Sequence, residues 1–321
     1  MSKQLWDAVE RNDLSALEKI ATLNPKASME YVKDGMTALH LAASKGNIEA
    51  CTLIVNANIY ALDVRGKSEK GDFYPKWTVL HFAASGVAGD EASVKLFENL
   101  AEIWPRLRDN ACEDVVGGDQ TLLHLAAARG KQSLCKLLFK WTPGAITFPD
   151  HNGLTPLHNM ITYNHMDLLE WFMHNGDESE IKAVTEALIS HAIKKHSMRI
   201  CNYLIPKMLC NLSDNEVPLS KKQTSLKTIL DQLREAKMFN TLESMKKQIT
   251  SSSNKELVSL YQELVETKEK AEEQSTADTA KIEASVRFHI EPANLKLVEA
   301  DQTNDVNVVG DVDTLEHEQG A

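Results

Sequence analysis

The stretch that decides the fold is TALHLAASKG, residues 37–46. It returns as TVLHFAASG at residues 78–86, as TLLHLAAARG at residues 121–130 and as TPLHNMITYN at residues 155–164. Each copy opens with Thr, has Leu two residues later and places His directly after that Leu. A phrase that recurs at long intervals indicates repeated structural units. The four histidines therefore mark either a shared chemistry or the architecture of each unit.

The repeated phrase has the features of a helix start. Thr at the N-cap can accept a hydrogen bond from an unpaired backbone N–H of the first turn. In the fourth copy Pro156 takes the first helical position, where proline is tolerated. The Leu and the paired alanines share one helix face, and Gly46 and Gly130 are placed to end the helix. A second apolar segment follows each phrase, so each copy predicts a pair of helices.

The spacing of the phrase matches a known repeat. His40, His81, His124 and His158 are 41, 43 and 34 residues apart. A period near 33 with a T-P-L-H-x-A phrase is the ankyrin signature, and the chain resembles the ankyrin repeat family. Weaker copies at residues 5–20 and 188–205 flank the four clear ones. The resemblance predicts an all-α ankyrin-repeat solenoid of about six repeats with hairpin-finger insertions.

Neither the histidines nor the cysteines are expected to carry chemistry. Equivalent residues of stacked repeats lie about 8–10 Å apart, whereas zinc holds its ligands at about 2.1 Å. We therefore expect no metal and no cofactor, and we expect each imidazole to form hydrogen bonds near its own helix start. Three cysteines recur at one apolar position of the second helix, whereas Cys112 and Cys210 fall outside it. The members of the recurring set are Cys51, Cys135 and Cys201.

Composition excludes several classes of partner. The net charge of −11 argues against binding to nucleic acid, and no apolar run is long enough to span a membrane. Five cysteines without a C-x-x-C pair favour a reducing, cytoplasmic location. Residues 276–321 hold ten acidic and three basic residues, and hence −7 of the net charge. This composition is typical of a disordered acidic tail.

The chain is predicted to have four parts. A polar stretch follows the repeats, and heptad-like leucines then indicate a helical hairpin or a short coiled coil. Whether these helices self-associate or fold against the last repeat stays open, although the stripe is too short to require an oligomer and a monomer is favoured. The predicted parts are an ankyrin repeat array (1–210), a linker (211–220), a helical C-terminal region (221–275) and the acidic tail (276–321).

The resemblance implies a non-enzymatic scaffold that binds a protein partner of unknown identity. Family members bind through the concave face, formed by first helices, and through the fingers. On that mapping the concave face holds Lys45, Ser85, Ala128, Arg129, Tyr163 and Asn164. One finger carries Phe73, Tyr74 and Trp77. Such aromatic residues are common interface anchors, but they can equally pack back on the array.

Two other functions stay open. The long insertions and the acidic end resemble the ankyrin effectors that intracellular bacteria secrete into host cells through a type IV system. That end clusters Asp311, Asp313, Glu316 and Glu318. The remaining alternative is an enzyme with a catalytic region from residue 220 onward. About 55 residues of helix supply too little core for an independent catalytic domain, so we expect no enzyme.

Overall fold

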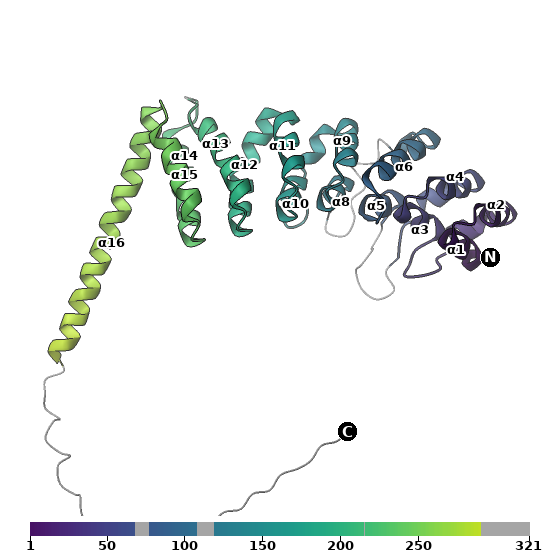
Figure 1. The fold of residues 1–321 in the computed structure, drawn as a ribbon, viewed down its shortest axis with the longest axis horizontal. Helices are drawn as coiled ribbons and strands as arrows, with labels where there is room; N and C mark the ends of the chain where they lie inside the picture. The colour runs from purple at the N-terminus through teal and green to yellow at the C-terminus, as the bar shows by residue number, and fades with distance from the viewer. Residues whose placement is uncertain (68–76, 108–118, 215, 290–321) are drawn as a thin grey trace, which may run out of the picture. The chain divides into compact units, whose positions relative to one another are not determined.

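The chain folds into consecutive helix pairs that stack side by side (Figure 1). The computed structural model describes residues 1–67, 77–107, 119–214 and 216–289. The pairs are α1 (Ser2–Arg11) with α2 (Leu14–Leu23), α3 (Ala38–Lys45) with α4 (Ile48–Ala57), α5 (Val79–Ser85) with α6 (Asp90–Ile103), α8 (Leu122–Arg129) with α9 (Gln132–Trp141), α10 (Pro156–Thr162) with α11 (Met166–Asn175), and α12 (Glu178–Lys194) with α13 (Met198–Leu212).

We call helices α1 to α13 the array, and their stacking follows one rule. Each first helix contacts the first helix of the next pair, from α1 through α12. The second helices do the same from α2 through α9. Short 3-10 helices η1 (Pro25–Met29), η2 (Ile59–Asp63) and η3 (Pro143–Ile146) follow three of the second helices, and no strand occurs in the described ranges. The predicted all-α solenoid is confirmed.

Tight turns connect some of the pairs. Between the first two pairs, the amide of Val32 donates to the carbonyl of Met36 at 2.9 Å, around a turn with Asp34 and Gly35 in the left-handed region. A similar turn lies before α10, where the Asp150 amide donates to the Leu154 carbonyl at 2.8 Å. The centres of the two predicted insertions, residues 68–76 and 108–118, lie outside the described ranges.

The repeated Thr and His form a reciprocal cap at each first helix. The Thr37 hydroxyl accepts from the His40 amide at 3.4 Å, and His40 Nδ1 accepts from the Thr37 amide at 3.1 Å. The same capping box begins α5, α8 and α10. Because a backbone N–H can only donate, Nδ1 is an acceptor and Nε2 carries the proton.

The other ring nitrogen ties one repeat to the next loop. His40 Nε2 donates to the Val64 carbonyl at 3.0 Å, and His124 Nε2 donates to the Leu154 carbonyl at 3.0 Å. In these rings the one available lone pair, on Nδ1, accepts the hydrogen bond from the threonine amide, and Nε2 carries the proton that it donates to the loop carbonyl. The architectural interpretation of the repeated phrase is confirmed for these two rings.

The recurring cysteines are core residues. Cys51, Cys135 and Cys201 lie on α4, α9 and α13, and all three are fully buried. Burial raises the pKa of each thiol, in Cys201 to about 12, so the thiols stay protonated and are poor nucleophiles.

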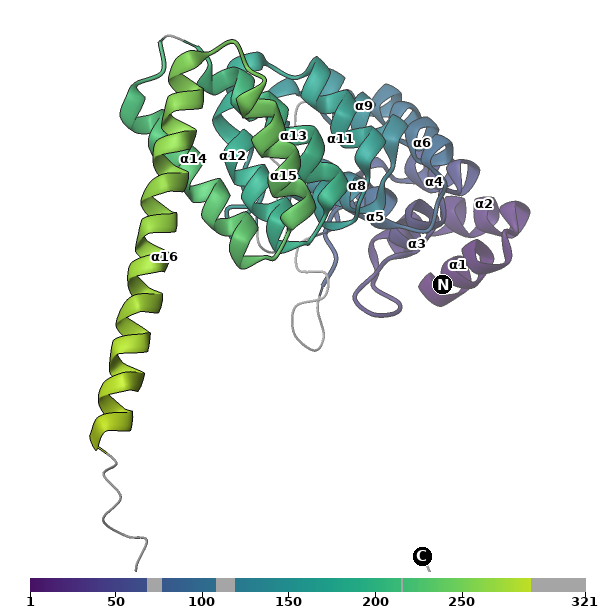
Figure 2. The ribbon, with the colours of Figure 1, turned by 60° about the vertical axis from the view of Figure 1, so that its left-hand side comes forward.

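Two further helices continue the stack beyond the predicted repeats. Helices α14 (Leu219–Glu235) and α15 (Phe239–Thr250) contact each other, and α14 also contacts α12 while α15 contacts α13. Both views place them beside the sixth pair (Figures 1 and 2). Of the two arrangements left open, the structure therefore has a helical hairpin folded against the last repeat.

The last helix departs from the predicted boundaries. Contacts divide the chain into one unit of residues 1–262 and a second of residues 263–321, and α16 (Lys255–His289) begins in the first and ends in the second. The helix continues past residue 275, where the tail was predicted to begin. Residues 290–321 lie outside the described ranges. The predicted linker is also shorter than expected, because α13 ends at Leu212 and α14 begins at Leu219.

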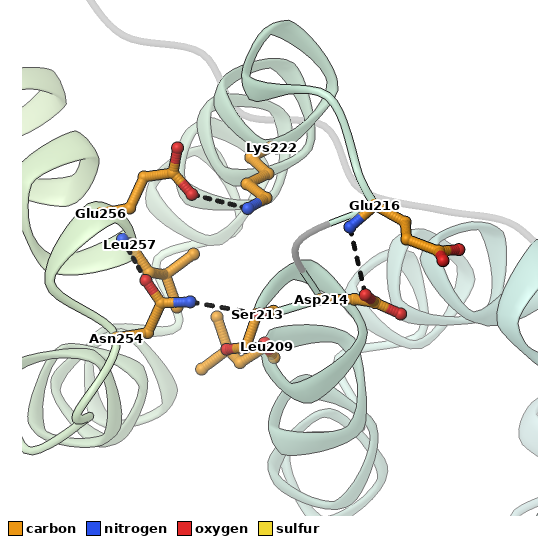
Figure 3. Close-up of polar contacts among 8 residues, drawn as sticks. All are labelled: Leu209, Ser213, Asp214, Glu216, Lys222, Asn254, Glu256 and Leu257. Carbon is orange, nitrogen blue, oxygen red and sulfur yellow. Dashed lines mark hydrogen bonds and ion pairs between the residues drawn. The ribbon is translucent and has the colours of Figure 1, made fainter.

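A cluster of polar contacts holds the start of α16 in place (Figure 3). The Asn254 carboxamide caps the helix by accepting from the Leu257 amide at 3.1 Å, and it donates to the Ser213 carbonyl at 3.3 Å. Beside it, the ammonium of Lys222 lies 2.6 Å from the Glu256 carboxylate. The Lys222 side chain is only 2% exposed, whereas that of Glu256 is 49% exposed.

Glu256→Gln should lower the free energy of unfolding by about 1–2 kcal/mol, because it leaves a buried ammonium beside a neutral partner. Adding Lys222→Met to the same chain should recover most of the loss, since methionine fills a similar volume without a charge. Urea denaturation of both variants measures the two effects. A double variant less stable than Glu256→Gln would contradict the assigned pairing.

Candidate functional site

The sequence-predicted concave residues lie at the ends of first helices. Lys45 and Arg129 are the last residues of α3 and α8, and Ser85 is the last residue of α5. Tyr163 and Asn164 directly follow α10. All are exposed except Ser85, which is half-buried, as is Ala128. Because the first helices contact one another in series, these ends form one row along the array.

A backbone feature fixes which residues are equivalent along the row. After most first helices one residue adopts the left-handed conformation, with φ between 53° and 68°. Those residues are Asn12, Gly46, Gly130, Asn164, His196 and Lys237. The residues just before these positions are therefore structurally equivalent to one another, which adds the exposed Arg11 and Lys195 to those predicted from the sequence. The sixth repeat lacks the Thr-x-Leu-His phrase, so the position of Lys195 follows from the backbone and could not be counted from a histidine.

The third repeat departs from this pattern. Helix α5 ends at Ser85, and the following turn has no left-handed residue. That turn leaves Val87 92% exposed. A Cβ on Gly46 would lie 2.6 Å from the Cβ of Ala88, so Val87, directly before Ala88, is taken as the residue next to Lys45 along the row. We define the first-helix row by the second to sixth repeats, as Lys45, Val87, Arg129, Tyr163 and Lys195; the first repeat places Arg11 at the same position.

Contacts between repeats hold the backbone beneath the row. The imidazole of His165 donates from Nε2 to the carbonyl of Ala128 at 3.2 Å, and its ring covers Gly130. A Cβ on Gly130 would lie 2.4 Å from that ring. The φ of 66° favours glycine at this position, and the close approach of the His165 ring excludes a Cβ there.

Gly130→Ala should lower the free energy of unfolding by about 1–2 kcal/mol more than Gly153→Ala does, because only the first substitution adds a clash. Gly153 is a matched control, since its φ is 73° and no atom lies within 4 Å of the point where a Cβ would stand. Thermal or urea denaturation of the pair isolates the contact with His165. Equal losses would show that the ring moves aside freely.

A nearby lysine and aspartate belong to the framework rather than to the surface. Lys131 is buried and donates to the Ala83 carbonyl at 2.8 Å and to the Ser93 hydroxyl at 2.9 Å. Burial lowers the pKa of its ammonium to about 8. The Asp90 carboxylate accepts from the amides of Ser133 and Leu134 at 2.6 and 2.9 Å, which satisfies two unpaired donors at the start of α9. Neither charge is available to a partner.

The cations of the row have no such structural partner. Lys45, Arg129 and Lys195 are exposed, and none forms an ion pair with another residue in the described ranges. The Lys45 ammonium only approaches the Glu10 carbonyl, at 3.4 Å. Three positive charges of the row are therefore presented to solvent.

Of the three predicted finger residues, the structure describes one, Trp77. Phe73 and Tyr74 lie outside the described ranges. Trp77 is half-buried, and its indole ring lies 5.3 Å from the ring of Phe82 in an edge-to-face arrangement. This contact is the packing alternative that the sequence left open. A role for these three aromatic residues in binding stays a prediction.

The described ranges contain no group of three or more His, Cys, Asp or Glu side chains arranged to hold a metal ion. They also contain no helix that is both long and apolar enough to cross a bilayer. The exposed thiol among the described cysteines, Cys210, lies on the last turn of α13, away from the row.

Comparison with known families agrees with the geometry. The family model of three ankyrin repeats matches residues 5–106, which correspond to the first three helix pairs up to the end of α6. The fourth and fifth pairs begin with the same capping box as the second and third. The array is thus all-α and built of stacked repeats. Residues 5–106 thus match the ankyrin repeat family, and the helix pairs that follow continue the same stack.

Proposed function

We propose that the array is a non-enzymatic scaffold that binds a protein partner along its first-helix row. Ankyrin repeats indicate a protein–protein interaction module. The observation that supports this particular surface is the difference in burial between the start and the end of each first helix. Thr, Leu and His of the repeated phrase are buried and engaged by the fold, whereas the helix ends carry exposed side chains that form no ion pair in the described ranges.

The composition of the row suits a protein interface. Arg and Tyr are enriched in interfaces, and Arg129 and Tyr163 present both residue types on adjacent repeats. Tyr163 is 56% exposed although its ring is large and largely apolar. The helices that carry the row are supported by neighbouring pairs on both sides, so the surface is preorganised and loses little entropy on binding.

Site-specific photo-crosslinking tests this proposal. A benzophenone amino acid replaces Tyr163 in one chain and Leu23 in another. Leu23 is a matched control because it is 78% exposed but ends a second helix. In lysate from the native cell, crosslinks to a protein partner are expected from the position of Tyr163 only. If the partner instead crosslinks only from the position of Leu23, the interface lies on the second helices and the proposal is wrong.

The secreted-effector alternative rests on the composition of residues 276–321, which hold −7 of the net charge. Fusing this segment to a reporter enzyme tests it in a bacterium with a type IV system. The alternative requires delivery of the reporter into host cells, and loss of delivery when Asp311, Asp313, Glu316 and Glu318 are replaced by alanine. A fusion that never reaches host cells would leave a scaffold that acts in the cytoplasm of its own cell.

A further inference from the structure

Cationic and uncharged side chains alternate along the first-helix row from the second to the sixth repeat, and the first repeat adds another cation, Arg11. Lys45, Arg129 and Lys195 belong to the second, fourth and sixth repeats, and Val87 and Tyr163 belong to the third and fifth. All five are exposed. The residues directly before and after each of them include no Asp or Glu. From the second to the sixth repeat the row therefore has three positive positions separated by two uncharged ones, on a chain whose net charge is −11.

Stabilisation of helix C-termini does not by itself explain why the row carries Lys and Arg side chains. A Lys or Arg at a helix C-terminus interacts favourably with the helix dipole, but this benefit applies equally to first and second helices. The final residues of the second helices include no cation. They are Leu23, Ala57, Ile103, Trp141, Asn175 and Leu212. Lys140 lies in the last turn of α9, but within the array the final residue itself is a cation only in first helices, namely Arg11, Lys45, Arg129 and Lys194.

We infer that the row binds an acidic, extended segment of the protein partner, with carboxylates six residues apart and apolar side chains midway between them. This inference rests on the proposed function and names the chemistry of the partner. Carboxylates are the groups that exposed Lys and Arg side chains recognise, and Arg129 can bind one with two parallel hydrogen bonds. Val87 and Tyr163 supply the apolar contacts between the charged positions.

The spacing of the repeats sets the spacing of the partner's side chains. Packed helices lie about 8–10 Å apart, and a polyproline II segment advances about 9.3 Å in each three-residue turn. Residues i, i+3 and i+6 of such a segment face the same side and so meet successive repeats. Carboxylates at i, i+6 and i+12 then reach the three cations. Residues i+3 and i+9 reach Val87 and Tyr163.

An α-helical partner fits this row less well. Two repeats span about 16–20 Å, which corresponds to about 11–13 helical residues at 1.5 Å each. A helix has 3.6 residues per turn, so carboxylates on a helical partner face the same side when they are about 11 residues apart. The partner's apolar side chains midway between those carboxylates then lie on the opposite face of the helix. The extended segment places all five contacts on one side.

A single-stranded nucleic acid is the competing anion, and the charge of the chain disfavours it. A polyanion is repelled at long range by a protein of net charge −11, whereas a short acidic segment with spaced charges is repelled far less. The row also offers only one aromatic ring for base stacking, Tyr163.

Fluorescence anisotropy with defined probes tests the inference on the full chain. The first probe is a labelled 15-residue proline-rich peptide with Glu at positions 2, 8 and 14 and Leu at positions 5 and 11. The second has the same composition with the three Glu residues adjacent, and the third is oligouridylate. The spaced peptide is expected to bind about tenfold more tightly than the clustered one, and to weaken as salt rises.

Two charge-matched triple variants separate the row from general electrostatics. Lys45→Glu with Arg129→Glu and Lys195→Glu should weaken binding of the spaced peptide by at least about tenfold. Lys19→Glu with Lys95→Glu and Lys140→Glu makes the same change of net charge on exposed residues of second helices, and should change affinity less than about twofold. Circular dichroism and thermal melting confirm that both variants fold.

Three results would overturn the inference: equal binding of the spaced and clustered peptides, equal losses in the two triple variants, or tighter binding of oligouridylate. These outcomes are distinguishable from failure of the proposed function. Crosslinking from the position of Tyr163 without peptide binding would keep the interface and reject the acidic segment. Peptide binding that depends on the row, without any crosslinked protein, would reject the scaffold proposal instead.

Discussion

Replacing Leu123 with alanine is expected to lower the free energy of unfolding by about 2–5 kcal/mol. Leu123 lies on α8 in the fourth repeat and is only 2% exposed. Helix α8 contacts α5 and α10 on its two sides as well as its own partner α9, so truncation opens a cavity among packed helices. The loss comprises the transfer free energy of the removed carbons and the cost of the cavity that remains.

Leu23→Ala is the matched control for this experiment, because Leu23 is 78% exposed at the end of α2. It should change stability by less than about 0.5 kcal/mol. Urea denaturation monitored by circular dichroism compares both variants with the parent chain. A Leu123→Ala chain that loses no more stability than the control would show that the assigned stacking of the fourth repeat is wrong.

Acidification is expected to destabilise the array between pH 6.5 and 4. Burial lowers the pKa of His40 to about 4, against the partial opposing effect of its bond to the Val64 carbonyl. Burial and then the neighbouring His191 lower the pKa of His158 to about 4 as well. In both caps Nδ1 accepts from a threonine amide, so a protonated ring would lose that hydrogen bond.

The sign follows from proton binding in the two states. Between pH 6.5 and 4 the unfolded histidines bind protons that the folded ones do not, so stability rises with pH and falls on acidification. At pH 5 each of the two rings should account for a loss of about 2 kcal/mol relative to neutral pH. Urea denaturation from pH 7.5 to 5 measures the slope, and His40→Gln should make it shallower. A flat or inverted profile would contradict the neutral caps.

The part of the fold that depends on the local sequence of each repeat could be predicted. The Thr-x-Leu-His phrase combines an N-cap, a core leucine and a ring that completes the cap, so its period alone predicted the stacked helix pairs. The outer boundaries depend instead on contacts between distant residues. Ser225 on α14 donates to the Glu186 carboxylate on α12 at 2.8 Å, and neither residue stands out in the sequence.

The candidate site was predictable only where the phrase is intact. Lys45, Arg129 and Tyr163 follow copies of the phrase, so their positions at helix ends could be counted from the histidines. Lys195 follows no such copy, and its place in the row depends on the left-handed conformation of His196. The side chain of Trp77 was open to two interpretations, because a sequence cannot show that an aromatic ring of a loop packs on Phe82.

Hydrogen–deuterium exchange of the full chain, alone and with the partner recovered by crosslinking, tests the central claim most directly. Binding along the first-helix row predicts slower exchange at the ends of the first helices, in residues 43–47, 84–88, 127–131, 161–165 and 193–197. Second helices, such as α4 and α9, should exchange at the same rate in both samples. Protection confined to second helices or to residues 219–262, with unchanged exchange along the row, would contradict the account.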